Sequence, residues 1–211
     1  MVNILLCILI GYAIGCISPS VIISKILHRN LREEGTGNYG ATNVTMVIGR
    51  GFGVFTMLFD IAKGAASYFL CTWLFGKTLY VAGLIAGLGA ILGHSFPFYN
   101  KFRGGKGLAA YGGVILAFNP RIFLVAIVVA LILMFIVNYT FIFVYSGTAA
   151  VAIIGALFTG DVVTTIILSM LALVIMFKHI PNLRKAFNSS DTGVRDYISK
   201  YILKKKKTDD K

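Results

Sequence analysis

The chain has 211 residues, of which 57% are hydrophobic and 13% are charged, and its net charge is +12. A soluble domain carries about 25% charged residues, so this composition excludes a soluble globular domain. The basic residues lie beside apolar runs rather than in a patch with interleaved aromatics, so they do not indicate nucleic-acid binding. The runs VAGLIAGLGAILG, IFLVAIVVALILMFIV and VVTTIILSMLALVIMF each supply most of one bilayer crossing, which needs about 20 helical residues. We therefore predict an all-α fold, a polytopic integral membrane helical bundle.

The first apolar segment, residues 3–25, is expected to form an uncleaved helix. AIGC (residues 13–16) loosely resembles a lipoprotein cleavage box, but no lysine or arginine precedes it, so the basic region of a signal peptide is missing. Cys7, Cys16 and Cys71 are odd in number, and all lie in apolar segments. We expect them to pack as small buried apolar residues rather than to form disulfides or a metal site.

Lysine and arginine cluster in residues 25–50, in residues 101–106 and from Lys178 onward. The positive-inside rule places all of these clusters in the cytoplasm, so an even number of crossings separates each from the next. Turns are expected at residues 75–78, 117–121, 137–140 and 158–161. The prediction is seven transmembrane helices, with the N-terminus outside and the C-terminus cytoplasmic. Five spans are the alternative, because residues 107–119 are short for a crossing.

We divide the chain into a membrane bundle, residues 1–190, and a basic cytoplasmic tail, residues 191–211, whose Lys204–Lys207 run suits anionic headgroups. Small residues recur at helical spacing in one span and are expected to let helices approach closely. These residues are Gly83, Gly87, Gly89, Ala90 and Gly93.

A polar, glycine-rich segment, EEGTGNYGATN, occupies residues 33–43 of the first cytoplasmic loop. Glycine permits positive φ and a close approach of the main chain to a ligand, and successive N–H groups of such a loop can bind an anion. An ordinary turn-rich loop is the other interpretation. The candidate binding residues here are Thr36, Gly37, Asn38, Thr42 and Asn43.

The second loop, HSFPFYNKFRGGKG at residues 94–107, contains no acidic residue and precedes an apolar helix. A helix N-terminus preceded by glycines binds phosphate readily, and lysine and arginine add charge. The loop is not a Walker A sequence, because GxxxxGK[ST] is absent. A positive-inside anchor would explain the basic residues but not the glycines or the histidine. The candidates are His94, Arg103, Gly104, Gly105, Lys106 and Gly107.

Two further pairs stand out at i, i+3 spacing. His179 and Asn182 share one helical face if the last helix continues past Pro181. Asp60 and Lys63 lie inside a span, where charges are costly and usually paired; a structural ion pair and a site-supporting role are both open.

No Ser-His-Asp or Cys-His arrangement, pair of loop carboxylates or metal-ligand cluster is evident in the sequence. We therefore expect chemistry by positioning and electrostatics, without a metal or cofactor.

These segments together resemble the motifs of the bacterial acyl-phosphate:glycerol-3-phosphate acyltransferases. GTGNYGATN is similar to their GSGNxGATN, GHSFPFYNKFRGGKG to their second motif, FDIAKG to D-x-x-K-G and HIPNLRK to H-x-x-N-I-x-R, in the same order. The resemblance implies a seven-helix enzyme of phospholipid synthesis in the bacterial cytoplasmic membrane, with its site facing the cytoplasm. Its reaction would be acyl transfer from acyl phosphate to the 1-hydroxyl of glycerol 3-phosphate, giving lysophosphatidic acid and phosphate.

The resemblance also implies residue roles and partners. Lys106 with Gly104, Gly105 and Gly107 would cradle phosphate, while Thr36, Asn38, Thr42 and Asn43 would orient glycerol phosphate. His179 and Asn182 would complete the site, and the implied catalytic residues are His179, Asn182, Asn43 and Lys106. Membrane lipid and the peripheral enzyme that makes acyl phosphate are further expected partners.

Several residues depart from the family pattern. Met46 stands where arginine is expected, and Asn138, Phe141 and Val144 stand where the third motif has an arginine and two serines. NSSDTG, residues 188–193, replaces the usual G-x-E. Each lost arginine removes a charge-assisted contact of about 1.5–3 kcal/mol. A catalytically weak or inactive relative that binds phosphate ligands or regulates is therefore a second hypothesis, and a small-anion transporter is a third.

Overall fold

The computed structural model describes residues 1–187, and this part of the chain is all-α, with no strand. The helices are α1 Val2–Cys16, α2 Pro19–Ile26, α3 Ala41–Val47, α4 Arg50–Phe75, α5 Ala82–Ser95, η1 Phe98–Asn100, α6 Leu108–Phe118, α7 Pro120–Val137, α8 Thr140–Thr159 and α9 Val162–Phe187. The predicted fold class is confirmed. The basic tail and the NSSDTG segment lie outside the described residues.

Six segments within residues 1–187 are long and apolar enough to cross a membrane. They are Val2–Ile26, Arg50–Phe75, Ala82–Asn100, Pro120–Val137, Thr140–Thr159 and Val162–Arg184. The remaining apolar helix, α6, has 11 residues, which is short for a crossing as expected. The count of seven spans and the orientation of the termini therefore stay predictions.

The first apolar segment is not one continuous helix, which corrects the expectation for residues 3–25. α1 ends at Cys16 and α2 begins at Pro19. Ser18 has φ −125° and ψ 102°, the extended conformation that a following proline imposes on its neighbour. The break leaves the carbonyl of Ile17 available to a side chain from α4, a contact that matters for the site.

The predicted turns coincide with the observed helix ends. α4 ends at Phe75, α7 at Val137 and α8 at Thr159. Between α6 and α7, the Asn119 side chain accepts hydrogen bonds from the backbone N–H groups of Arg121 and Ile122, at 3.0 and 3.2 Å. This cap satisfies N–H groups that have no partner inside α7, and so it fixes the helix start that the Asn-Pro pair predicted.

Small residues allow the helices around α5 to touch through their backbones. A Cβ atom added to Gly89 would lie 2.4 Å from the carbonyl oxygen of Ile8, and one added to Gly93 would lie 2.2 Å from that of Tyr12. Both contacts join α5 to α1, and Gly64 makes the equivalent contact from α4 to Ala110 of α6, at 2.1 Å. The packing role predicted for the small residues of α5 is thereby confirmed at these positions.

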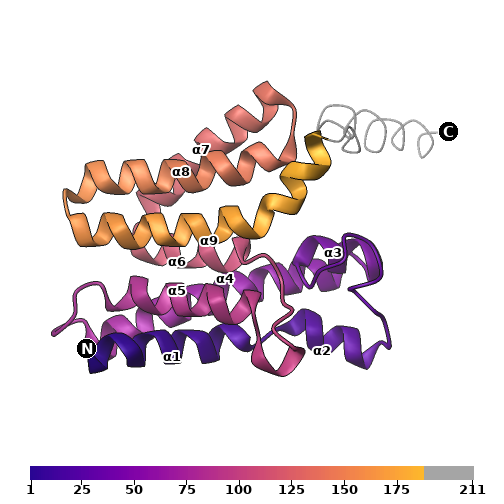
Figure 1. Ribbon diagram of the computed structural model, residues 1–211, viewed down its shortest axis with the longest axis horizontal. Helices are drawn as coiled ribbons and strands as arrows, with labels where there is room; N and C mark the ends of the chain where they lie inside the picture. The colour runs from indigo at the N-terminus through magenta and orange to yellow at the C-terminus, as the bar shows by residue number, and fades with distance from the viewer. Residues whose placement is uncertain (188–211) are drawn as a thin grey trace.

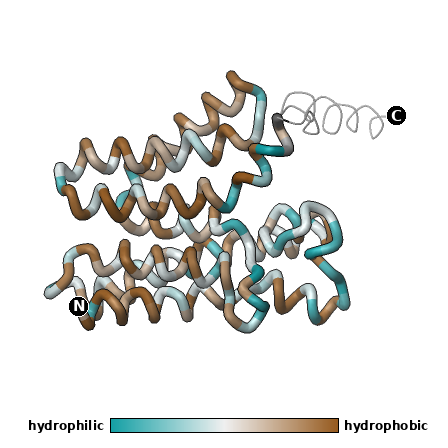
Figure 2. The backbone as a smooth tube through the Cα atoms, in the orientation of Figure 1, coloured by the Kyte–Doolittle hydropathy of each residue, from teal (hydrophilic) through white to brown (hydrophobic). Residues whose placement is uncertain are grey.

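The outer helices present large apolar side chains to their surroundings. The span containing α5 is 72% buried, whereas the α7 span is 17% buried. Leu124 and Ile136 of α7 are exposed by 60% and 66%, and Figure 2 shows hydrophobic residues along most of the length of the helices. A soluble monomer rarely exposes so large an apolar surface, so these faces are suited to lipid. The cysteines Cys7, Cys16 and Cys71 are free and buried, as predicted.

The polar segments gather at one end of the bundle. In Figure 1 the loop between α2 and α3, the loop between α5 and α6, the α7–α8 turn and the end of α9 all lie toward the right, away from the N-terminus. The helix ends therefore bring the sequence motifs to a common face, although they are spread from Gly35 to Arg184.

Candidate functional site

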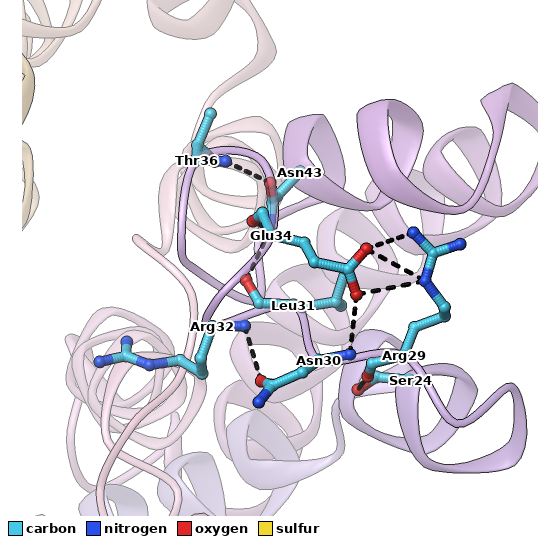
Figure 3. A network of polar contacts seen from close by, with 8 residues as sticks. All are labelled: Ser24, Arg29, Asn30, Leu31, Arg32, Glu34, Thr36 and Asn43. Atoms are coloured by element: carbon cyan, nitrogen blue, oxygen red, sulfur yellow. Dashed lines mark hydrogen bonds and ion pairs between the residues drawn. The ribbon is translucent and has the colours of Figure 1, made fainter.

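The first loop is organised around one buried side chain, Asn43 of α3. Its side-chain amide donates to the carbonyl oxygens of Leu31 and Asn38, each at 2.8 Å, and to that of Glu34 at 3.2 Å. Its Oδ1 accepts the backbone N–H of Thr36 (Figure 3). Asn43 is fully buried, so both ends of its amide are used to shape the loop.

An ion pair closes the outer side of the same loop. The Arg29 guanidinium contacts the carboxylate of Glu34, which also accepts the backbone N–H of Asn30 at 3.0 Å (Figure 3). Hydrogen bonding from Arg29 holds the pKa of the Glu34 carboxyl below its ordinary value. The backbone N–H of Arg32 donates to Asn30 Oδ1 at 3.1 Å, whereas its side chain points away from the network in Figure 3. Glu34 thus supports the fold of the loop.

Glycine is required at two points of the first loop. Gly35 and Gly37 have φ of 60° and 72°, the left-handed region that other residues adopt at a cost. A Cβ on Gly35 would lie 2.2 Å from Asn43 Oδ1. Between the two glycines Thr36 is exposed, and its hydroxyl accepts from Asn38 Nδ2 at 2.9 Å. Of the candidates here, Thr36 and Thr42 are exposed and Gly37 and Asn38 are half-buried.

The second loop folds back on the end of α5. The N–H groups of Gly104 and Gly105 donate to the carbonyl oxygens of Ser95 and His94, at 3.1 and 3.2 Å. These two N–H groups are therefore used within the loop, and this changes how the loop is expected to hold phosphate. Gly107, with φ 84°, is the N-cap residue of α6, whose start has no side-chain cap and no acidic residue in its first turn. The other donors of this segment are the Lys106 ammonium, which donates to Asn182, and the N-terminal turn of α6.

The glycines of this loop also make room for a histidine. A Cβ on Gly105 would lie 2.2 Å from His94 Nε2, and one on Gly104 would lie 2.0 Å from the carbonyl oxygen of His94. His94 is 3% exposed, so its ring forms the floor beneath Gly105. Arg103, in contrast, is exposed on the turn that follows η1.

α9 continues through Pro181 to Phe187, so His179 and Asn182 do share a helical face. Lys106 Nζ donates to Asn182 Oδ1, which joins the second loop to α9. His179 Nδ1 lies 2.8 Å from the carbonyl oxygen of Ile175. A carbonyl can only accept, so Nδ1 carries the hydrogen, and Nε2 of the neutral ring is left with its lone pair. The structure thus places Lys106, His179 and Asn182 together near the C-terminal end of α9.

Asp60 and Lys63 are buried together with His94. Lys63 Nζ lies 2.7 Å from Asp60 Oδ1 and 3.0 Å from His94 Nδ1, and it donates to the carbonyl oxygen of Ile17 at 2.8 Å. His94 Nδ1 is also 3.3 Å from Asp60 Oδ1. The pair is therefore more than an isolated ion pair, because it reaches the histidine of the second motif.

Lys178 is a residue of this region that sequence reasoning used only for topology. Its Nζ donates to the carbonyl oxygen of Ser95 at 3.4 Å and lies 4.3 Å from the centroid of the Phe96 ring. It therefore ties α9 to the end of α5 beside the glycine loop. A basic residue directly before His179, at the end of an apolar span, was the signal available in the sequence.

The described residues contain no group of three His, Cys, Asp or Glu side chains that could hold a metal ion. What the arrangement offers is a lysine, an uncapped helix start and a histidine lone pair, all at one end of a membrane bundle. Such a set can bind a phosphate group and accept a proton from a hydroxyl group beside it.

Comparison with known proteins gives consistent matches over nearly the whole chain. A family model described as glycerol-3-phosphate acyltransferase matches residues 5–189. A glycerol-3-phosphate acyltransferase of Listeria monocytogenes is 34% identical over 195 residues, covering 92% of this chain and 98% of the relative. One from Streptococcus thermophilus is 38% identical over 203 residues, covering 91% and 93%.

Solved structures of an integral membrane glycerol 3-phosphate acyltransferase, PlsY, have a similar fold. Its glycerol 3-phosphate form superposes with a TM-score of 0.81 at 26% identity, and its lysophosphatidic acid form with 0.79 at 25%. Each match covers 90% of this chain and 94% of the PlsY chain.

Proposed function

The chain belongs to the glycerol-3-phosphate acyltransferase family, and on that premise we propose that its second loop and the end of α9 form the active site, with the first loop closing it. The protein is a multi-pass bacterial membrane enzyme that transfers an acyl group to glycerol 3-phosphate in phospholipid synthesis. We further propose that acyl phosphate is the donor and that the site faces the cytoplasm.

The contact between Lys106 and Asn182 carries the assignment of the site. Both substrates of the proposed reaction contain phosphate, and Lys106 lies directly before the uncapped start of α6. A lysine and a helix N-terminus together attract a phosphate dianion. Asn182 helps to fix the position of the ammonium group, because its Oδ1 accepts a hydrogen bond from Nζ. Gly104 and Gly105 contribute by their lack of side chains rather than by their N–H groups.

His179 is suited to accept the proton of the attacking hydroxyl. Its Nδ1–H is held by the carbonyl oxygen of Ile175 at 2.8 Å, which leaves the Nε2 lone pair as the acceptor. The hydroxyl oxygen of glycerol 3-phosphate bonds to the acyl carbonyl carbon while its proton passes to Nε2. The bond from that carbon to the phosphate oxygen then breaks, and phosphate leaves with the electron pair. The acyl group of an acyl phosphate is already activated, so no covalent protein intermediate is needed.

The first loop serves as the wall of this site. Thr36 and Thr42 are exposed and can donate to glycerol phosphate, with Gly37 and Asn38 shaping the turn between them. Asn43 is assigned a positioning role, since its amide is committed to the loop backbone. His94 supports Gly105 from below, and Arg103 is left as an exposed cation near the entrance.

The described site residues do not favour the hypothesis of an inactive relative. Met46 and Asn138 remove charges expected of the family, but Lys106, His179 and Asn182 are all present and in place. The transport hypothesis depended on Asp60 and Lys63, and their side chains are buried and engaged with each other.

The direct test uses purified protein in detergent with palmitoyl phosphate and labelled glycerol 3-phosphate. We expect labelled lysophosphatidate, with palmitoyl-CoA inactive as a donor. Lys106→Ala and His179→Ala should each lower kcat/KM. Trp73→Ala serves as the control, because Trp73 is exposed near the C-terminal end of α4, and it should leave kcat/KM unchanged. Binding of glycerol 3-phosphate without any turnover would support the inactive relative instead. Counterflow of glycerol phosphate in liposomes without acylation would support transport.

The sidedness of the site is tested separately by thiol labelling in intact cells. Thr36→Cys and Lys101→Cys are suitable positions, because both residues are exposed and Gly105→Cys would collide with His94. A membrane-impermeant reagent should label both only after the cells are opened. Labelling of the two positions from opposite faces of the membrane would contradict the proposed site.

A further inference from the structure

A buried charge cluster lies beneath the glycine loop and is not used in the proposed reaction. It consists of Asp60 and Lys63 of α4 and His94 of α5, which are exposed by 2, 4 and 3%. Charges inside a membrane bundle are costly and usually have a function beyond packing. The contact between Lys63 and His94 bears on which nitrogen of the histidine ring carries the hydrogen.

Three acceptor atoms lie close to the Lys63 ammonium group. A lysine ammonium has three N–H donors and no acceptor. Lys63 Nζ donates to the carbonyl oxygen of Ile17 at 2.8 Å, and it lies 2.7 Å from Asp60 Oδ1 and 3.0 Å from His94 Nδ1. The break between α1 and α2 supplies the first of these acceptors, since a continuous helix would use the Ile17 carbonyl itself. The ammonium is therefore oriented by groups from the α1–α2 break, from α4 and from α5.

This orientation decides which nitrogen of His94 carries the hydrogen. Because Lys63 can only donate, Nδ1 must accept, and the hydrogen of the neutral ring is then on Nε2. Asp60 Oδ1 is farther from Nδ1, at 3.3 Å, and has no aligned hydrogen bond among the described residues. A hydrogen on Nδ1 would point at an ammonium 3.0 Å away, an arrangement of two donors that is unfavourable.

Nε2 of His94 is the atom that lies against the glycine loop. A Cβ on Gly105 would be 2.2 Å from it, so the ring edge meets the backbone where a side chain would otherwise be. Gly105 precedes Lys106, whose ammonium we assign to phosphate. The Nε2 edge of the ring therefore meets the glycine loop one residue before Lys106.

We propose that Lys63 is a positioning residue that holds His94 in its Nε2–H form, so that this N–H donates to phosphate at the loop of Gly104–Gly107. The proposal rests on the proposed function for the identity of the ligand. It gives the two histidines opposite roles: His179 presents an acceptor nitrogen and His94 presents a donor. Asp60 balances the charge of Lys63 and so keeps the ammonium in place.

The tautomer itself is measured by NMR on protein labelled with ¹⁵N-histidine. The chain has three histidines, and His94→Gln identifies the signals of His94. We expect an unprotonated Nδ1 and a protonated Nε2, and a shift of Nε2 when inorganic phosphate is added. A protonated Nδ1, or an Nε2 signal that phosphate leaves unchanged, would overturn the proposal.

The kinetic test removes the ion pair as a unit. Asp60→Leu combined with Lys63→Met replaces both charges by apolar groups of similar size, which often preserves stability. If Lys63 acts through His94, this variant should show mixed His94 tautomers and roughly a tenfold to hundredfold lower kcat/KM for glycerol 3-phosphate, with an unchanged unfolding temperature. Unchanged tautomer and activity would mean that the pair only stabilises the bundle.

A second comparison uses His94 alone. Glutamine places an N–H group near the position of Nε2, whereas asparagine places one near Nδ1, so His94→Gln should retain more activity than His94→Asn. The reverse order would contradict the proposal. If the unmodified protein transfers no acyl group, the proposed function fails, yet the NMR result still decides the tautomer. If transfer occurs and Nδ1 is protonated, the inference fails alone.

Discussion

Lys106 Nζ donates a hydrogen bond to Asn182 Oδ1, and this contact joins residues 76 positions apart in the chain. It holds the end of the glycine loop against α9, next to His179. Lys106 supplies the positive charge, and Asn182 positions the ammonium group. Mutation can therefore test the charge and its position separately.

The first prediction is that Asn182→Asp weakens phosphate binding more selectively than Asn182→Ala. Aspartate keeps the contact with Lys106 but neutralises its charge, so KM for glycerol 3-phosphate should rise about tenfold or more with the fold intact. Alanine should lower kcat as well, because the ammonium is no longer fixed. Steady-state kinetics of both variants test this. Equal KM values for the aspartate variant and the unmodified protein would contradict the assignment.

The second prediction concerns Asn43. Asn43→Ala leaves the buried carbonyl oxygens of Leu31 and Asn38 without donors, which should destabilise the protein by about 2–3 kcal/mol. Glu33→Ala is the matched control in the same loop, because Glu33 is exposed and should change stability by less than about 0.5 kcal/mol. Denaturant or thermal unfolding of both variants measures the difference. An Asn43→Ala protein of full stability but without activity would show instead that Asn43 acts on substrate directly.

The third prediction separates glycines that are required from one that is not. Gly105→Ala would place a Cβ 2.2 Å from His94 Nε2, and Gly35→Ala would place one 2.2 Å from Asn43 Oδ1 with φ at 60°. Both should lower the unfolding temperature and the activity. Gly51→Ala, in the first turn of α4, meets nothing within 4 Å and should be neutral or slightly stabilising. Thermal unfolding of the three variants in detergent is the measurement. A neutral Gly105→Ala would mean that the loop can move away from His94.

Much of the fold was predictable because hydropathy and turn chemistry are local. The Asn-Pro pair at Asn119 and Pro120 marks a helix boundary in the sequence, and α7 begins there. The break at Ser18–Pro19 was missed, because the surrounding apolar run favours one helix and the proline effect acts on only two residues. The long-range contacts could not be predicted, because contacts between residues far apart in the chain leave no local signal. Nothing in the neighbouring sequence indicates that Lys63 contacts both the Ile17 carbonyl and His94. Likewise, the glycine pattern predicted a phosphate loop, but not that the N–H groups of Gly104 and Gly105 are already bonded.

The fourth prediction restores a charge that the chain lacks. Met46 of α3 is 64% exposed, so Met46→Arg can be made without disturbing the core. If the missing arginine limits phosphate binding, this variant should raise kcat/KM by up to about tenfold, at the lower end of a charge-assisted hydrogen bond. Adding Asn138→Arg tests the second lost arginine, although Asn138 has φ 68°, where arginine is less favourable than asparagine. Met46→Lys, which lacks the guanidinium fork, is the control for charge alone. No gain in Met46→Arg would mean that another residue already provides this contact.

The fifth prediction is a pH dependence of the first loop. Arg29 holds the pKa of the Glu34 carboxyl below its ordinary value, which is about 4.3 in an unfolded chain. The stabilisation of the loop by this carboxylate is therefore fully present when the pH is above the pKa of the unfolded chain. It is lost only as the pH falls through the lower pKa of the folded protein. Amide hydrogen exchange of residues 29–40, corrected for intrinsic rates, should be constant from about pH 8 to pH 5 and rise in stronger acid.

Glu34→Gln should exchange faster over the whole range and lack the acid transition, because glutamine cannot form the ion pair. Since the pair is at the surface, high salt should bring the unmodified protein toward the variant. An acid transition that persists in Glu34→Gln would assign the loop's pH response to another group.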